Sequence, residues 1–152
     1  MVFGKLVSGS EKNEQMQQVT DIRNAVLGQE LQLPIKEEPD AFCMYALAYE
    51  GETPVATGGI SFDGASYQMK EVAVLPEFRR KKYGDFIVRL LIDKAMLSGA
   101  QTIEADVLQG AEVLFQEVGF AEAGAWYEKE GRQWQPMQLQ AGNIHKCCNC
   151  GQ

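Results

Sequence analysis

The sequence is poor in histidine and has no long apolar segment. Its 152 residues include one histidine, His145, so a histidine-based catalytic triad beside the predicted strands is not expected. No apolar run approaches the roughly 20 residues that cross a bilayer, and the N-terminus has no signal-peptide pattern. We therefore expect a cytoplasmic protein with no membrane partner.

A broad basic surface is also missing, because the formal net charge is −7. Nucleic-acid binders usually carry such a surface, so we expect no nucleic-acid partner. The exception is a local run of cations at 79–82, which suits a small polyanion better than a long one. Apolar residues make up 45% of the chain, as in ordinary globular proteins. The length predicts one domain.

Hydrophobic periodicity predicts both strands and helices. After a first strand at 2–7, Ser8 and Glu11 stand at capping-box spacing, and an apolar stripe predicts a helix over 11–28 that ends at Gly28. Strands are predicted at 42–49, 54–62 and 67–74, an antiparallel meander with a hairpin signal at Asp63-Gly64.

The second half alternates helices and strands. A helix over 84–98 is closed by Gly99 and is followed by a strand at 102–107, a short helix at 112–118, and strands at 120–128 and 133–139. We expect the strand at 102–107 to join the sheet parallel to the strand at 67–74, through a right-handed crossover.

The stretch 71–86 joins a strand to a helix through a basic turn. Val72 and Val74 are β-branched, and Pro76 ends their apolar run because proline cannot donate to a sheet ladder. Four consecutive cations follow, and then the helix begins. Backbone N–H groups and positive charge at a helix start favour binding of a phosphate.

This stretch resembles the cofactor-binding motif of the GNAT superfamily of acyl-CoA-dependent N-acyltransferases. That motif reads Gln/Arg-x-x-Gly-x-Gly/Ala after a strand; Arg79 and Gly84 match it, and Lys82 replaces the first glycine. The segment Ala111-x-x-Leu114-Phe115-x-x-x-Gly119-Phe120 looks like a second conserved block of the family. Residues 22–30 and 49–58 are similar to a bacterial subgroup.

The resemblance covers residues 1 to about 140 and implies a fold. We expect an α/β (α+β) protein with a mixed, largely antiparallel central sheet flanked by helices. The acyltransferase domain would span 1–140, and a cysteine-rich, flexible tail would span 141–152.

The resemblance also implies acetyl-CoA as cosubstrate and no metal. The pantetheine arm would lie along Val72, Ala73 and Val74, with a backbone N–H near Val74 stabilising the thioester carbonyl. The pyrophosphate would bind the backbone of the turn, formed by Arg79, Arg80, Lys81, Lys82, Tyr83 and Gly84. Lys82 is expected to be tolerated there with a φ below zero, because it still has its N–H.

A general base is expected because an alkylamine is almost fully protonated at neutral pH. Glu71 is the candidate, since it is a carboxylate in an otherwise apolar strand where many GNAT enzymes carry a glutamate. The alternative is a solvent-facing strand glutamate. Glu104 and Asp106 on the next strand are second choices.

The general acid of the family has no match. Phe115 stands where many members have the tyrosine that protonates the leaving thiolate, and Leu108 replaces an asparagine that often opens this block. Tyr83, Tyr127 or Cys43 could substitute, and the sequence does not select among them. A thiolate with a pKa near 8.5 can also leave without an acid.

Three further groups of residues have open roles. Glu37, Glu38 and Asp40 form an acidic patch that favours a cationic acceptor. For the aromatic residues of the last strands we expect core or homodimer packing rather than an acceptor pocket: Trp126, Tyr127 and Trp134. Four soft-metal ligands crowd the tail but seldom close a tetrahedron at such spacing, so no metal site is expected: His145, Cys147, Cys148 and Cys150.

The sequence therefore predicts an N-acetyltransferase. It would move an acetyl group from acetyl-CoA to a primary amine of a small-molecule or protein acceptor by direct attack. Two alternatives remain. One is a weak or inactive acyl-CoA-binding module, and the other is a metal- or redox-sensing protein that acts through the cysteine tail.

Overall fold

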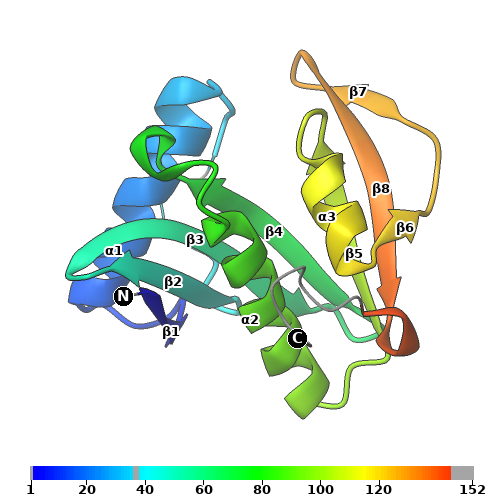
Figure 1. Ribbon diagram of the computed structural model, residues 1–152, viewed down its shortest axis with the longest axis horizontal. Helices are drawn as coiled ribbons and strands as arrows, with labels where there is room; N and C mark the ends of the chain where they lie inside the picture. Colours follow the sequence, from blue (N-terminus) through cyan, green and yellow to red (C-terminus); the bar gives the residue numbers. More distant parts are fainter. Residues whose placement is uncertain (1, 36–37, 145–152) are drawn as a thin grey trace.

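Residues 2–35 and 38–144 are described by the computed structural model, in which eight strands form one sheet (Figure 1). The strands are β1 (Val2–Ser8), β2 (Met44–Glu50), β3 (Thr53–Phe62), β4 (Tyr67–Val74), β5 (Thr102–Leu108), β6 (Ala121–Glu122), β7 (Tyr127–Lys129) and β8 (Arg132–Gln140). The helices are α1 (Glu14–Arg23), α2 (Tyr83–Leu97) and α3 (Glu112–Val118), with a π-helix η1 (Asn24–Glu30) and short 3₁₀ turns η2 (Pro76–Phe78) and η3 (Ala141–Asn143).

The sheet is mixed and largely antiparallel. Its strand order is β1-β2-β3-β4-β5-β8-β6, and β7 pairs with β8. Strands β1 to β4 pair antiparallel in sequence order, and β5 pairs with β4 in parallel after α2. The predicted meander, the parallel crossover and the fold class are confirmed.

Two apolar cores cover the two faces of the sheet, because side chains alternate along each strand. On β2, Tyr45 and Leu47 face α1 and pack against Val19, whereas Ala46 and Ala48 belong to the core beneath α2. The small alanines leave room for the larger side chains of α2, several of which are fully buried. These are Ile87, Leu91 and Ile92. Burial of each side chain contributes about 1.5–3 kcal/mol to the stability of the fold.

The first helix differs from the prediction at both ends. Its N-cap is Asn13, whose side chain accepts the Met16 N–H at 3.0 Å, and not Ser8. Gly28 does not end it, because the chain continues as η1 to Glu30. A glycine ends a helix through a left-handed conformation, which Gly28 does not adopt.

The last predicted strand pair is also divided. The segment 120–128 contains β6 and β7 as separate short strands, both paired with β8. The loop between them is held by side-chain and backbone bonds to β8: Gln135 Nε2 donates to the Gly124 carbonyl at 2.6 Å, and the Ala123 N–H donates to the Pro136 carbonyl at 2.9 Å.

Candidate functional site

β4 and β5 pair over three residues and then diverge. The parallel ladder joins Tyr67 to Ile103, Gln68 to Glu104 and Met69 to Ala105. Within the part of the chain that the structure describes, no further pair joins them, although β4 continues to Val74. Figure 1 shows the two strands spreading apart. The edge of β4 in this region is therefore available to an extended ligand.

A β-bulge in β4 begins where the strands part. Glu71 has a left-handed backbone with φ 58°, and the register with β3 shifts between Thr57 and Gly59. The extra residue puts Lys70 and Glu71 on the α1 side of the sheet in succession. Val72 and Val74 then pack against the core beneath α2.

The candidate base Glu71 is held in an ion pair. Its Oε1 accepts a hydrogen bond from Nε of Arg23, and the Tyr45 hydroxyl lies 3.5 Å from the same oxygen. The Arg23 side chain is 2% exposed and that of Glu71 is 18% exposed. Glu71 is thus not a solvent-facing glutamate. Among the described residues, none donates a hydrogen bond to Oε2.

Sequence reasoning missed Arg23 as the partner of Glu71. A signal was present, because Arg23 is the one cation in the apolar stripe of the first helix. Its partner lies 48 positions away, and no local pattern identifies a partner at that separation.

The side chain of Arg79 fixes the basic turn in place. Its guanidinium binds both oxygens of Glu30 at 2.6 and 2.5 Å, and Nε donates to the Val74 carbonyl at 3.1 Å. The hydrogen bond from Arg79 lowers the pKa of Glu30. The Arg79 side chain therefore holds the turn against η1 and the end of β4. The backbone N–H groups of the turn remain available to an anion.

The other cations of the turn differ in how they are paired. Lys81 lies 3.7 Å from a Glu50 carboxylate oxygen. Arg80 is exposed and takes part in none of the ion pairs among the described residues. Of the side chains of Arg79, Arg80 and Lys81, that of Arg80 is the one available to a phosphate without breaking an existing ion pair.

The backbone of the turn is left-handed at two positions. Arg80 has φ 65° and Lys82 has φ 66°. The expectation of a φ below zero at Lys82 is wrong: the path of the chain demands the conformation that glycine adopts easily, and the lysine adopts it at a cost of about 1–2 kcal/mol. Left-handed residues in a turn aim successive N–H groups at a common anion position.

The start of α2 adds further donors beside the turn. The first intrahelical bond runs from the Phe86 N–H to the Lys82 carbonyl at 3.0 Å, so the N–H groups of Tyr83, Gly84 and Asp85 have no acceptor within the helix. A Cβ on Gly84 would lie 3.0 Å from Leu114 and 3.7 Å from Val74. Glycine therefore lets the helix start pack closely against the end of β4.

One residue considered for the general acid, Tyr83, already donates a hydrogen bond elsewhere. The Tyr83 hydroxyl donates to Glu50 at 2.6 Å, and this hydrogen bond raises the pKa of Tyr83 to about 12. Phe115 is buried in the core with its ring edge-on to Phe120 at 5.2 Å. Burial and the nearby Asp106 raise the pKa of Tyr127.

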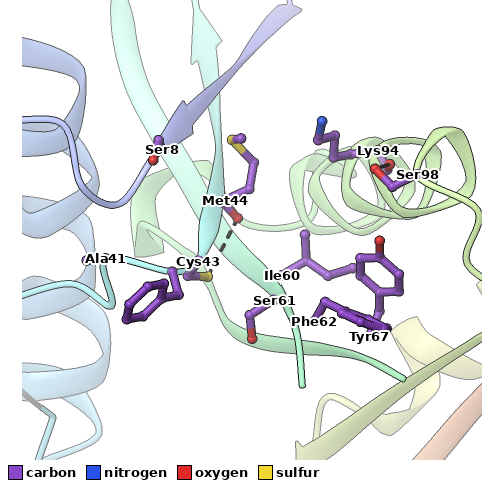
Figure 2. A pocket seen from close by; sticks show the side chains of 11 residues that line it. Ser8, Ala41, Cys43, Met44, Ile60, Ser61, Phe62, Tyr67, Lys94 and Ser98 are labelled. Atoms are coloured by element: carbon purple, nitrogen blue, oxygen red, sulfur yellow. Dashed lines mark hydrogen bonds between the residues drawn. The ribbon is translucent and has the colours of Figure 1, made fainter. Parts of the chain in front are cut away.

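Cys43 lies far from the basic turn. It lines an apolar pocket of about 220 Å³, together with Met44, Ile60 and Phe62 (Figure 2). Lys94 and Ser98 border this pocket from the last turn of α2, and a helix of that length separates them from the basic turn by about 20 Å. Burial raises the pKa of the Cys43 thiol to about 11. The charges of Lys70 and Glu71 act on the same thiol, and a role for Cys43 as the acid stays a prediction.

The second-choice bases Glu104 and Asp106 line another pocket, of about 210 Å³, between β4, β5 and β8. Glu104 already accepts bonds from Ser66 Oγ at 3.2 Å and from Gln68 Nε2 at 3.3 Å. This pocket borders the paired part of β4 and β5, at Gln68, Glu104 and Ala105, rather than the part where the two strands have diverged.

The expected core packing of the aromatic residues on the last strands is wrong. None of them belongs to a buried cluster, and Trp126 is 42% exposed. Trp134 is half-buried, and its indole N–H donates to the Lys129 carbonyl at 3.1 Å. A homodimer contact stays a prediction.

Several predicted features fall partly or wholly outside the described residues. Of the acidic patch, Glu37 is outside, Glu38 is exposed, and Asp40 is ion-paired with Lys70 at 2.9 Å. The tail ligands are outside as well: His145, Cys147, Cys148 and Cys150. Within 2–35 and 38–144, no group of metal-binding side chains and no helix long and apolar enough to cross a membrane is found.

The chain is similar to known proteins both in sequence and in fold. Over residues 12–120 the chain matches the model of the acetyltransferase (GNAT) family. The fold is similar to an acyl-CoA N-acyltransferase from Pseudomonas aeruginosa, with a TM-score of 0.79, 10% identity, and coverage of 91% of this chain and 99% of that one. No curated protein matches the chain.

Two Escherichia coli structures are also similar. ElaA has a TM-score of 0.78 and 17% identity, with 92% of this chain and 100% of that one covered. The ribosomal-protein-S18-alanine N-acetyltransferase has a TM-score of 0.71 and 16% identity, with 97% and 98% covered. These likenesses show the fold, and the family match covers most of the chain. The protein therefore belongs to the GNAT acetyltransferase family, the acyl-CoA-dependent N-acyltransferases.

Proposed function

We propose that the protein transfers an acetyl group from acetyl-CoA to a primary amine by direct attack. The observation that carries this proposal is the divergence of β4 from β5 beside the donor-rich start of α2. An unpaired strand edge next to an anion-binding turn fits a ligand with an amide-bearing arm and a pyrophosphate.

The residues of this region fit the two parts of acetyl-CoA. The edge of β4 at Val72, Ala73 and Val74 would bond the pantetheine amides. The N–H groups from Arg79 to Gly84 would hold the pyrophosphate, with Arg80 as the available side-chain charge. Acetyl-CoA would supply the acyl thioester, and the strand edge and the turn would hold that thioester in place.

The chemistry then needs a proton acceptor and an oxyanion donor. The amine nitrogen attacks the thioester carbonyl carbon, the C–S bond breaks, and the amine proton passes to Oε2 of Glu71, directly or through water. A backbone N–H near Val74 would bond the carbonyl oxygen, a type of contact worth about 3 kcal/mol. Coenzyme A leaves as a thiolate, so no acid is required where Phe115 stands.

The acceptor is proposed to be a cationic small molecule or protein amine. Exposed Glu38 supports this choice, and so do the two carboxylates of β5, Glu104 and Asp106, which line the neighbouring pocket. A cytoplasmic protein that forms homodimers remains part of the proposal, as does a tail at 141–152 with no metal and no role in catalysis.

The binding half of the proposal is tested by calorimetric titration of acetyl-CoA and free CoA. Wild type is expected to bind with micromolar affinity. Arg80→Ala should weaken binding about tenfold, whereas Lys81→Ala should weaken it less, because Lys81 is already paired with Glu50. If wild type binds neither compound, the proposed function is wrong.

The catalytic half is tested by thiol release from acetyl-CoA over a panel of polyamines, aminoglycosides and lysine peptides. Glu71→Gln removes the base, while its amide oxygen can still accept the Arg23 hydrogen bond, so kcat should fall at least tenfold and by more than CoA affinity does. Tight CoA binding with no turnover on any amine would favour the binding module instead. The observation that supports this second function, an inactive acyl-CoA-binding module, is that the buried Phe115 has no hydroxyl to protonate the leaving thiolate.

A further inference from the structure

Arg23 is a buried cation at the end of α1. Its side chain is 2% exposed and its Nε is bonded to Glu71 on β4. Burying a guanidinium costs several kcal/mol unless an anion accompanies it. Glu71 supplies that anion, so the position of its carboxylate on the α1 side is energetically coupled to Arg23.

The ion pair acts on the bulged residue of β4. In a regular strand, successive side chains alternate between faces, so Glu71 would follow Lys70 onto the opposite face. The left-handed backbone at Glu71 returns its side chain to the face of Lys70. That conformation costs about 1–2 kcal/mol in an L-residue, and the bond to Arg23 offsets the cost.

The bulge coincides with the end of the seam between β4 and β5, that is, the short parallel ladder that joins residues 67–69 to residues 103–105. The last pair of the ladder is Met69 with Ala105, and the bulged residue follows within two positions. A bulge bends its strand and increases the local twist. The unpaired edge at Val72, Ala73 and Val74 thus begins directly after the residue that Arg23 holds.

We propose that Arg23 is a positioning residue that keeps the pantetheine-binding edge of β4 open. By pairing with Glu71 it holds the bulge, and the bulge directs residues 72–74 away from β5. Arg23 touches no ligand in this arrangement. The inference rests on the proposed function for the identity of the ligand, but not for the shape of the strand.

Binding at the strand edge can be distinguished from binding at the basic turn with two ligands. Coenzyme A spans both parts, whereas its nucleotide half, 3′-phosphoadenosine 5′-diphosphate, reaches only the turn and the start of α2. Removal of Arg23 should therefore weaken CoA and leave the nucleotide half unaffected. General damage to the fold would weaken both.

The variants are Arg23→Met, Arg23→Lys and the control Lys70→Met. Lys70 is the neighbouring residue on the same face, and its ion pair with Asp40 does not involve the bulged residue. Arg23→Met is expected to bind CoA at least tenfold more weakly than wild type, with affinity for the nucleotide half within twofold. Arg23→Lys should recover part of the loss, and Lys70→Met should bind both ligands as wild type does.

Three outcomes would overturn the inference: a folded Arg23→Met with wild-type CoA affinity, an equal loss for both ligands, or the same loss in Lys70→Met. If Arg23→Met does not fold, Arg23→Lys decides, and wild-type CoA affinity in that variant would contradict the inference. If wild type itself binds no CoA, the proposed function fails separately. Amide exchange at residues 72–74 then tests the strand alone, and it should change in Arg23→Lys but not in Lys70→Met.

Discussion

Lys82 adopts a backbone conformation that is usual for glycine and strained for a residue with a side chain. Its φ of 66° falls in the left-handed region, where an L-residue costs about 1–2 kcal/mol. We predict that Lys82→Gly is more stable than Lys82→Ala by about 1 kcal/mol, because both lose the charge and only glycine loses the strain. Thermal unfolding of the two variants measures the difference.

Lys81 provides the matched control, since its backbone is not left-handed. There the order should reverse, with Ala more stable than Gly by up to about 1 kcal/mol, because glycine has more freedom to lose on folding. The same order at both positions would show that the conformation of Lys82 is not strained.

At the residue scale, the sequence located the candidate side chains but not their partners. Glu71 was identified as a carboxylate in an apolar strand, and it does lie at the point where β4 leaves β5. Its partner Arg23 and the partner Glu30 of Arg79 could not be predicted, because each pair joins residues nearly 50 positions apart. Such pairs depend on the packing of whole elements.

Between elements, the Glu30–Arg79 pair joins the end of η1 to the basic turn. The pKa of Glu30 is lowered from 4.5 by the hydrogen bond to Arg79. A carboxyl group with a lowered folded-state pKa stabilises the fold above its unfolded pKa, and this contribution is lost as the pH falls through the folded value. Both side chains are over a third exposed, so the pair is worth at most about 1 kcal/mol.

We therefore predict that Glu30→Gln is less stable than wild type by a few tenths to about 1 kcal/mol at pH 7. The gap should hold down to about pH 4.5 and disappear below it. Thermal unfolding from pH 3 to 7 measures the gap. Exposed Glu52 serves as the control, and Glu52→Gln should match wild type throughout this range. A gap that widens in acid would contradict the assigned pair.

The elements themselves were largely predictable, and their ends were not. Alternation of apolar residues located the meander, and the 3.6-residue period located α2 within one residue of each end. Gly28 was predicted to end the first helix because glycine is common there. The π-helix instead carries the chain on to Glu30, which places that carboxylate beside Arg79.

In the whole molecule, Arg132 links the β5–β8 half of the sheet to the segment after η1. Its Nε and Nη2 donate to the Leu31 carbonyl at 3.1 and 2.8 Å. Hydrogen bonds from a charged group contribute about 1.5–3 kcal/mol. We predict that Arg132→Ala lowers the free energy of unfolding by about 1–2 kcal/mol, as measured by urea denaturation.

Arg132→Lys is the control for this prediction, because it keeps a charged donor but loses the two-pronged geometry. It should recover part of the loss. Faster amide exchange along β5 in Arg132→Ala would show that the bond holds the two halves together. Unchanged stability in both variants would mean that the bond is not maintained in solution.

The fold class could be predicted because it follows from the order of strands and helices. The divergence of β4 from β5 could not, because no residue type marks the end of a ladder. Lys82 was expected to be tolerated in the turn with a φ below zero. The left-handed backbone there shows instead that the turn keeps the path that glycine allows, with a different side chain.

The short seam also affects how the chain folds while it is being synthesised. Every ladder among β1 to β4 joins segments that are complete by residue 74, whereas the seam needs residues 103–105. At about 5–20 residues per second, β4 is an open sheet edge for roughly 2–6 s on the ribosome. Open edges pair with other chains, and bulges and charges on the edge suppress such pairing. We therefore expect the bulge and the charges of Lys70 and Glu71 to limit aggregation of the nascent chain at the same strand edge that is proposed to bind the cosubstrate.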